Sequence, residues 1–181
     1  MTVQVPFYRF LSLSLFFCPL FHSLFSSDWT RFRGPNGSGR SVGMELPKEW
    51  TREDYRWIIE LPGVGHSSPV IWKNKVFTTT SNEKNGDQYV QCNDVANGSV
   101  IWKKKFQSEH YPHHKFNRFA SATPCVDKAL LLTSWTTKES NDLLCLGHDG
   151  TLKWRRDFGN FLTQHGNGFS PILHQDKVIV T

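Results

Sequence analysis

Cysteine is scarce in this chain of 181 residues, which has only four cysteines and no Cys-x-x-Cys pair. No histidine stands at zinc-finger spacing from them either, so the pattern of a small metal-stapled domain is absent. Three cysteines, Cys92, Cys125 and Cys145, follow residue 27, an odd number for a closed set of disulfides. We predict that all three are buried small hydrophobic residues.

The chain also lacks a concentrated charge of either sign. Its net charge is +5, and its Lys and Arg residues are scattered apart from two runs, residues 103–105 and 155–156. Each run follows a tryptophan at the same point of a repeat, which is typical of a solvated strand edge. A nucleic-acid partner would need a concentrated basic face, so we predict none.

The first 27 residues carry almost no charge. Arg9 is their only charged residue, and residues 10–25 are nearly all Leu, Phe and Ser. Such a stretch is short for crossing a hydrocarbon slab of about 30 Å and is typical of a signal peptide. We predict export to the periplasm or the extracellular space. Because Phe25 stands where a cleavage site favours a small residue, an uncleaved segment is the alternative, and it would be the only membrane contact.

Aromatic and turn-forming residues are abundant instead. Aromatic residues make up 14% of the chain, which also has 13 Gly and 9 Pro. This composition favours many short strands and tight turns over long helices. The predicted fold class is all-β.

Internal similarity is the strongest signal in the sequence. One unit opens at residues 67–69, Ser-Ser-Pro, and closes at Trp102. A second opens at residues 121–124, Ser-Ala-Thr-Pro, and closes at Trp154. A third opens at residues 170–171, Ser-Pro, and the sequence stops within it. The period of about 50 residues is typical of propeller repeats.

Each unit contains the pattern of four short strands. Two apolar strands flank an Asn-Lys or Asp-Lys turn, and a third and a fourth strand flank Asn97-Gly98 or Asp149-Gly150. The latter pairs predict type I′ hairpin turns, because Gly, Asn and Asp tolerate positive φ. Four antiparallel strands per unit are typical of a β-propeller blade, and the chain is too short to close the ring.

A tryptophan closes each unit and is predicted to be architectural. At the end of an outer strand, a large flat side chain can pack against the neighbouring blade and cover its edge. We assign this role to Trp102, Trp154 and Trp57, the last as the tryptophan of an incomplete earlier unit.

Residues 93–102, Asn-Asp-Val-Ala-Asn-Gly-Ser-Val-Ile-Trp, resemble the tryptophan-docking motif of the pyrroloquinoline-quinone (PQQ) repeat. Residues 28–39 resemble the opening of secreted PQQ-like β-propeller proteins of planctomycete type. The predicted organisation is a signal peptide at 1–27, a lead-in segment at 28–56, and a partial propeller at 57–181 with about two complete blades plus partial ones.

This resemblance implies functions of two classes. Quinoprotein alcohol dehydrogenases use the repeat to hold PQQ and calcium, whereas the propeller lipoprotein of the outer-membrane assembly machinery uses it as a binding scaffold without a cofactor. The enzyme would need a catalytic Asp, oxygen ligands for calcium and commonly a Cys-Cys pair. The sequence has no Cys-Cys pair and no acidic cluster on an expected inner strand.

We therefore predict a binding or scaffolding module with an unknown protein or carbohydrate ligand and no evident cofactor. The alternative is a PQQ- and calcium-dependent dehydrogenase that oxidises an alcohol or a sugar. A third possibility is a sensor or adhesive surface attached to another domain.

Histidines are the densest potential metal ligands. They are His110, His113 and His114 in one loop, and His66 and His165 just before the openings of two units. A zinc-type site needs several ligands converging at about 2.0–2.3 Å, and nothing in the sequence brings these loops together. The sequence assigns no catalytic, cofactor-binding or metal-ligating residue.

Overall fold

The computed structural model describes residues 28–41, 47–111, 114, 116–117, 119–160 and 168–180. The predicted signal peptide, residues 1–27, lies outside them. Within these ranges the chain forms ten strands and one short 3-10 helix, η1 (Arg52–Asp54). No helix in the described part is long and apolar enough to cross a membrane. The predicted all-β class is confirmed.

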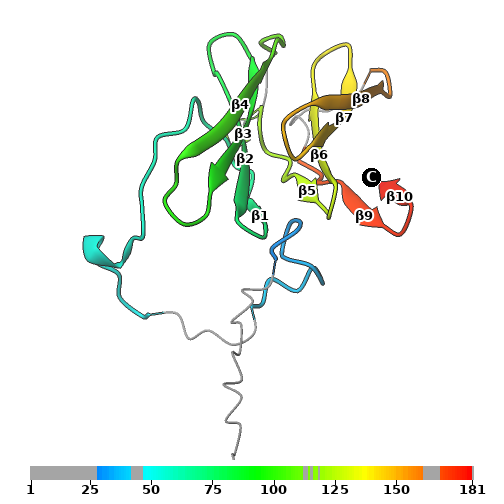
Figure 1. The fold of residues 1–181 in the computed structure, drawn as a ribbon. Coiled ribbons are helices and arrows are strands. Elements are labelled where there is room, and N and C mark those ends of the chain that lie inside the picture. The colour runs from blue at the N-terminus through cyan, green and yellow to red at the C-terminus, as the bar shows by residue number, and fades with distance from the viewer. Residues whose placement is uncertain are drawn as a thin grey trace, which may run out of the picture.

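Two four-stranded antiparallel sheets form the body of the molecule (Figure 1). Blade 1 consists, in sheet order, of β1 (Val70–Trp72), β2 (Lys75–Ser81), β3 (Gln88–Asp94) and β4 (Val100–Phe106). Blade 2 consists of β5 (Cys125–Val126), β6 (Leu130–Thr136), β7 (Asn141–Gly147) and β8 (Leu152–Asp157). A hairpin of β9 (Ile172–His174) and β10 (Lys177–Ile179) begins a third unit. The predicted four-stranded blades are confirmed.

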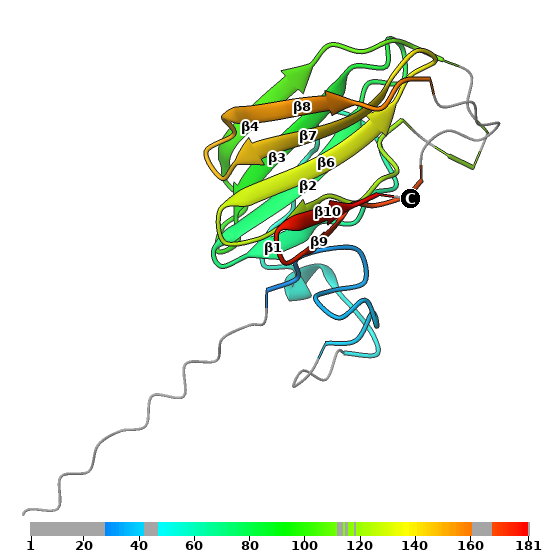
Figure 2. The same cartoon turned by 90° about the vertical axis from the view of Figure 1, so that its right-hand side faces the viewer.

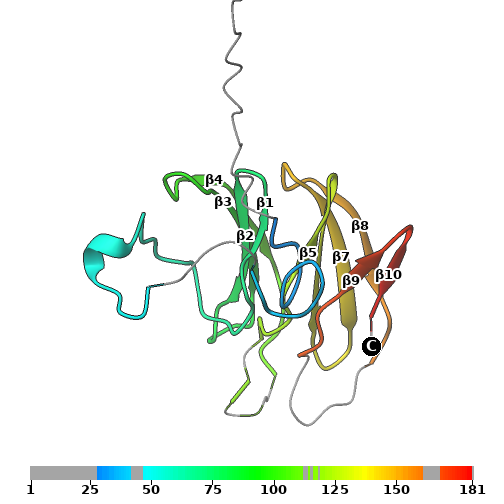
Figure 3. The ribbon, with the colours of Figure 1, turned by 90° about the horizontal axis from the view of Figure 1, so that it is seen from below.

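The sheets stand face to face around their inner strands. Strand β1 contacts β5, and β5 contacts β9, so the first strands of successive units are neighbours. Figure 2 shows the strands of blade 2 lying over those of blade 1, and Figure 3 shows the sheets side by side from below. This is the arrangement of blades in a propeller whose ring is open.

The core lies between the two blades. Its buried side chains are Val70, Phe77, Val90 and Cys92 from blade 1, and Val126, Leu131, Trp135, Leu144 and Leu146 from blade 2. A second cluster on the other face of blade 2 buries Leu132, Leu143 and Cys145 against Leu173, Val178 and Val180. Because both faces of blade 2 are covered, β6 and β7 are apolar at consecutive positions and do not alternate.

The three cysteines are free and buried, as predicted. Cys92 lies opposite Trp102, and Cys145 lies opposite Trp154, so the two hold the same position in their blades. Burial raises the pKa of the Cys92 thiol to about 11 and also raises the pKa of Cys125 and Cys145. Thiols with raised pKa values are poor nucleophiles at neutral pH.

Two of the three predicted packing tryptophans dock onto the turn of the next blade. Trp102 of β4 donates its Nε1 hydrogen to the carbonyl oxygen of His148 in blade 2, at 2.8 Å. Trp57 donates to the carbonyl oxygen of Val95 in blade 1, also at 2.8 Å. The architectural role predicted for these two residues is confirmed. Trp154 is 40% exposed, and its role stays a prediction.

The turns that receive these rings are not type I′, so that prediction was wrong. Type I′ places both central residues at positive φ. Only the glycines, Gly98 at +75° and Gly150 at +79°, adopt it. Their N–H groups donate to the carbonyls of Asp94 and Gly147, respectively, both at 2.9 Å. The docked ring selects the glycine: a Cβ at Gly98 would lie 2.7 Å from the Trp57 ring.

Hydroxyl groups link the segments that open successive units. The N–H of Ser68 donates to Oγ1 of Thr123 at 2.9 Å, and the N–H of Thr123 donates to Oγ of Ser170 at 2.9 Å. Each of these residues precedes the proline of its unit, and a following proline holds it in an extended conformation. The hydroxyl of Thr123 therefore bonds to the unit before it, and the N–H of Thr123 bonds to the unit after it.

The predicted lead-in segment, residues 28–56, is attached to both blades. The carbonyl oxygen of Trp29 accepts a hydrogen bond from Ile71 of β1, and that of Thr30 accepts one from Val126 of β5, both at 2.8 Å. The chain's own backbone thus occupies hydrogen-bonding positions on the inner strands of both blades.

Candidate functional site

A polar groove lies where β4 and β8 end and β3 and β7 begin. It consists of a larger hollow of about 510 Å³ and a smaller one of about 480 Å³, and both are lined by Gln107 and Ser108. We call the two hollows together the interblade groove. Its charged lining is Glu109, Glu139, Asp142, Arg155 and Asp157 in the larger hollow, and Asp87 and Lys105 in the smaller one.

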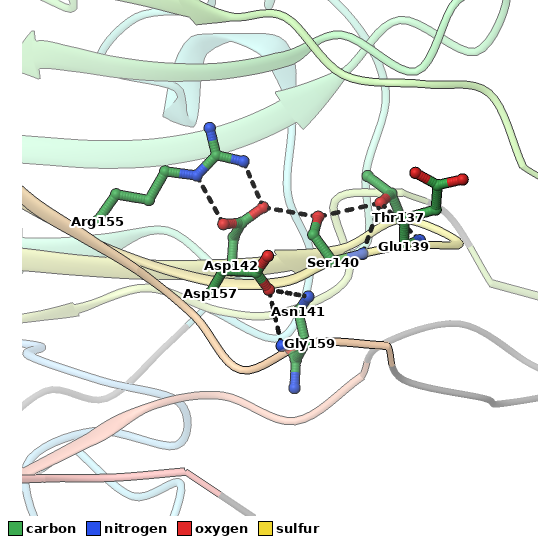
Figure 4. Close-up of polar contacts among 8 residues, drawn as sticks. All are labelled: Thr137, Glu139, Ser140, Asn141, Asp142, Arg155, Asp157 and Gly159. Carbon is green, nitrogen blue, oxygen red and sulfur yellow. Dashed lines mark hydrogen bonds and ion pairs between the residues drawn. The ribbon is translucent and has the colours of Figure 1, made fainter.

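A two-pronged ion pair between Arg155 of β8 and Asp142 of β7 lies in the larger hollow (Figure 4). Nε donates to Oδ1 at 2.6 Å, and Nη2 donates to Oδ2 at 2.7 Å. Such bidentate pairs fix the orientation of both groups. The Asp142 side chain is fully buried and that of Arg155 is 52% exposed. The hydrogen bond to Asp142 raises the pKa of Arg155, so the guanidinium stays charged.

The loop between β6 and β7 supports Asp142 from the other side. Ser140 Oγ donates to Asp142 Oδ2 at 2.9 Å. Thr137 shapes this loop, because its Oγ1 accepts hydrogen bonds from the backbone N–H groups of Glu139 at 3.2 Å and Ser140 at 3.1 Å. Figure 4 shows the Glu139 carboxylate pointing away from the ion pair.

Asp157, the last residue of β8, is held by backbone groups. Its Oδ1 accepts hydrogen bonds from the N–H of Gly159 at 2.9 Å and from the N–H of Asn141 at 3.0 Å (Figure 4). These two bonds favour the ionised form and lower the pKa of Asp157.

Blade 1 contributes a second acidic and basic pair. Lys105 Nζ lies 2.7 Å from Asp87 Oδ2. Asn85 Nδ2 donates to Asp87 Oδ2 at 2.8 Å, and the N–H of Ser108 donates to Oδ1 at 3.2 Å. The hydrogen bond from Lys105 is the main cause of the lowered pKa of Asp87.

The groove therefore contains charged side chains that hydrogen bonds hold in fixed positions. A general acid that works near neutral pH needs a raised pKa, whereas the pKa values of Asp87 and Asp157 are lowered. Ionised carboxylates are acceptors only, so these side chains can receive hydrogen bonds from hydroxyl or ammonium groups. The arrangement suits the binding of a donor-rich ligand.

The predicted histidines do not assemble in the described part of the chain. His66 donates through its backbone N–H to Ala120, while the rings of His110 and His114 contact Phe119 and Phe116, respectively. His113 and His165 lie outside the described residues. No group of three His, Cys, Asp or Glu side chains within the described ranges could hold a metal ion.

Sequence reasoning did not single out the groove, although a signal for it exists. The basic runs after Trp102 and Trp154 lie on the exposed outer strands and include Lys105 and Arg155. The start of a third strand meets the end of the fourth across an antiparallel hairpin. An acidic residue near the start of the third strand and a basic residue after the tryptophan of the fourth strand are therefore expected to meet.

No protein-family model matches the chain, and no curated protein matches it. Among solved structures, the chain is similar to BamB from Moraxella catarrhalis, with 16% sequence identity and a TM-score of 0.48. The alignment covers 68% of this chain, which spans only 36% of that protein.

Proposed function

We propose that the chain is part of an exported β-propeller that acts as a binding or scaffolding module, with the interblade groove as its ligand contact. The observation that carries this proposal is the engagement of the carboxylates in the groove. Asp142 is committed to Arg155 and Ser140, and Asp87 and Asp157 accept hydrogen bonds that lower their pKa values. Groups held in this way position a ligand better than they transfer protons.

The charge of the groove indicates the chemistry of the ligand. Three exposed carboxylates, those of Glu109, Glu139 and Asp157, line the larger hollow, where the only cation, Arg155, is paired with the buried Asp142. An acceptor-rich surface favours a ligand that donates hydrogen bonds: the ammonium groups of a protein segment or the hydroxyl groups of a carbohydrate.

Calorimetric titration with three probes tests this proposal. A cello-oligosaccharide offers hydroxyl groups, oligolysine offers ammonium groups, and a chitosan oligosaccharide offers both. We expect at least one probe to bind, and the double variant Glu139→Gln/Asp157→Asn to weaken it by about tenfold, or about 1.4 kcal/mol. Glu60→Gln, an exposed residue outside the groove lining, is the matched control. Binding that both variants retain, or binding of none of the probes, would contradict the proposal.

Export is tested by sequencing the amino terminus of the protein recovered from the cell envelope or the medium. We expect a mature chain that begins near Asp28. Retention of the whole protein in the cytoplasm would contradict export.

The alternative function, a PQQ- and calcium-dependent dehydrogenase, gains no support from a cluster of calcium ligands in the described part of the chain. Calcium requires six to eight oxygen ligands, and no three acidic or histidine side chains converge within the described ranges. Adding PQQ and calcium to the protein and finding alcohol-dependent dye reduction would overturn the binding proposal.

A further inference from the structure

The larger hollow of the interblade groove contains hydrogen-bond donors as well as carboxylates, and one donor has no acceptor. Trp135 of β6 lines the hollow and is only 4% exposed. It lies directly opposite Asp142 on the β6–β7 ladder, so both side chains lie on the same face of blade 2. The Nε1 groups of Trp57 and Trp102 donate to carbonyl oxygens, whereas that of Trp135 donates no hydrogen bond in the described part of the chain. Since nearly all buried polar groups have a partner, this indole points to an acceptor on a ligand.

Two further groups in the groove have unused hydrogen-bonding capacity. Arg155 bonds to Asp142 through Nε and Nη2, so its Nη1 keeps its N–H groups for another acceptor (Figure 4). Ser108 lines both hollows, and its Oγ is buried without a partner in the ranges that the structure describes. The groove therefore offers donors in addition to its carboxylates.

An acceptor of the larger hollow lies beside these donors. Arg155 and Asp157 stand at alternate positions of β8, so their side chains lie on the same face of the sheet. Both backbone hydrogen bonds to Asp157 end on Oδ1, which leaves Oδ2 to accept from a ligand. A carboxylate beside a guanidinium can bind two adjacent hydroxyl groups, because one hydroxyl donates to the carboxylate and the other accepts from the guanidinium.

This combination of donors and acceptors selects among ligand classes. An ammonium group carries donors only, so it cannot accept from Trp135 or Arg155. An anion accepts only, and the exposed carboxylates of Glu109, Glu139 and Asp157 repel it. A hydroxyl group both donates and accepts. The hollow of about 510 Å³ is also within the range of about 300–1,000 Å³ that is usual for small-molecule sites.

We propose that the larger hollow binds a sugar residue of an uncharged oligosaccharide, through adjacent hydroxyl groups that donate to Asp157 and accept from Trp135 and Arg155. This inference rests on the proposed binding function of the interblade groove and narrows its ligand to a neutral carbohydrate. Because the ligand has no charge, its affinity depends on hydrogen bonds and is insensitive to salt.

NMR spectra of the indole N–H groups test the contact with Trp135 in the whole protein. Addition of a neutral oligosaccharide that binds should move the Trp135 Nε1 proton downfield and slow its exchange with water, because it gains an acceptor. The Nε1 protons of Trp57 and Trp102 are the internal controls and should not move, since they already donate to carbonyl oxygens. Binding that leaves the Trp135 signal unchanged would overturn the proposal.

Calorimetric titration with neutral oligosaccharides of the cello-, malto- and galacto- series tests the ligand class. At least one should bind, with an affinity that changes less than about twofold between low and high salt. Asp157→Asn should weaken this binding by about tenfold, because a charged acceptor is lost. Asp176→Asn, at an exposed aspartate outside the groove lining, is the matched control and should not weaken it.

Oligolysine separates this inference from the proposed function on which it rests. If oligolysine binds in the groove and none of the neutral oligosaccharides does, the carbohydrate inference is overturned while the groove remains a ligand contact. If neither class of probe binds, both proposals are overturned. Equal losses of oligosaccharide binding in Asp157→Asn and Asp176→Asn would overturn the assignment of the site to the larger hollow.

Discussion

Blade 1 and blade 2 share a framework but differ in one face, the face that blade 2 turns toward blade 1 and the equivalent face of blade 1. In blade 2 this face carries Leu144 and Leu146, which are buried in the core between the blades. The equivalent positions in blade 1 hold Gln91 and Asn93, which are also buried. Gln91 Nε2 donates to Asn93 Oδ1 at 3.0 Å, and Asn93 Nδ2 donates to the carbonyl of Gly98 at 2.8 Å.

This difference distinguishes the positions at which the repeat keeps one residue type from the positions at which it accepts different residue types. The turn glycine, the cysteine opposite the tryptophan and the hydroxyl before the proline recur because each contacts a neighbouring unit. The face residues need only be buried with their polar atoms satisfied, so an amide network can replace a leucine pair.

The largest expected effect concerns the two outer-strand tryptophans. Trp102→Ala should lower the free energy of unfolding by about 3–5 kcal/mol, because it removes a ring packed between the blades and the hydrogen bond to His148. Trp154→Ala, whose ring is 40% exposed, should cost less than about 1 kcal/mol. Urea denaturation followed by circular dichroism measures both values. Equal losses would show that docking onto the next blade is not what distinguishes them.

The next prediction exchanges the residues that differ between the faces. Leu144→Gln places an amide without the Asn93 partner in an apolar core and should cost about 2–4 kcal/mol. Gln91→Leu removes one donor to Asn93 and should cost about 1–2 kcal/mol. Urea midpoints of the two variants give the comparison. A tolerated Leu144→Gln would mean that blade 2 also provides partners for a buried amide.

The ion pairs of the groove also differ between the blades, because Arg155 donates two hydrogen bonds to Asp142 whereas Lys105 makes one contact with Asp87. Arg155→Met leaves the buried Asp142 carboxylate without a cation and should cost about 2–3 kcal/mol, below the value for a fully buried pair because Arg155 is half exposed. Arg156→Met, on the same exposed strand, is the control and should be nearly neutral. Thermal unfolding in low and high salt measures both variants, and equal shifts would contradict a specific role for Arg155.

Repetition explains how much of this structure could be predicted from the sequence. The spacing of Pro69, Pro124, Trp102 and Trp154 predicted the blades, because these residues recur at the same places in successive units. Turn geometry was not predicted, since the ring that selects Gly98 comes from a distant segment. The residues next to Gly98 in the sequence do not indicate that the Trp57 ring packs there.

The groove is harder to predict because its parts do not repeat in register. Asp87 and Lys105 stand two ladder positions nearer to the strand ends than Asp142 and Arg155 do, relative to the cysteine and tryptophan of each blade. An alignment of the two units therefore places Asp142 against Tyr89. The structure shows what the alignment does not: in both pairs the basic residue lies diagonally across the ladder from its aspartate.

The smallest predicted effect concerns Asp87 of blade 1 and Asp157 of blade 2, whose pKa values are lowered by different causes. Lys105 is the main cause for Asp87, and the backbone N–H groups of Gly159 and Asn141 are the main cause for Asp157. Both carboxylates stabilise the fold at pH values above the unfolded pKa of about 3.9, and this stabilisation is lost as the pH falls through the lower folded values.

Salt should act on only one of the two carboxylates. At 1 M salt the screening length falls to about 3 Å, which weakens an ion pair whose lysine is 56% exposed but not a backbone hydrogen bond. Carboxyl-carbon NMR titrations should therefore show the pKa of Asp87 rising toward its usual value in high salt while that of Asp157 stays low. Asp157→Asn should reduce the acid-dependent loss of stability that salt leaves in place. If salt moves both pKa values alike, Asp157 depends on a nearby cation such as Arg155, and the contrast between a blade held by an ion pair and one held by its backbone fails.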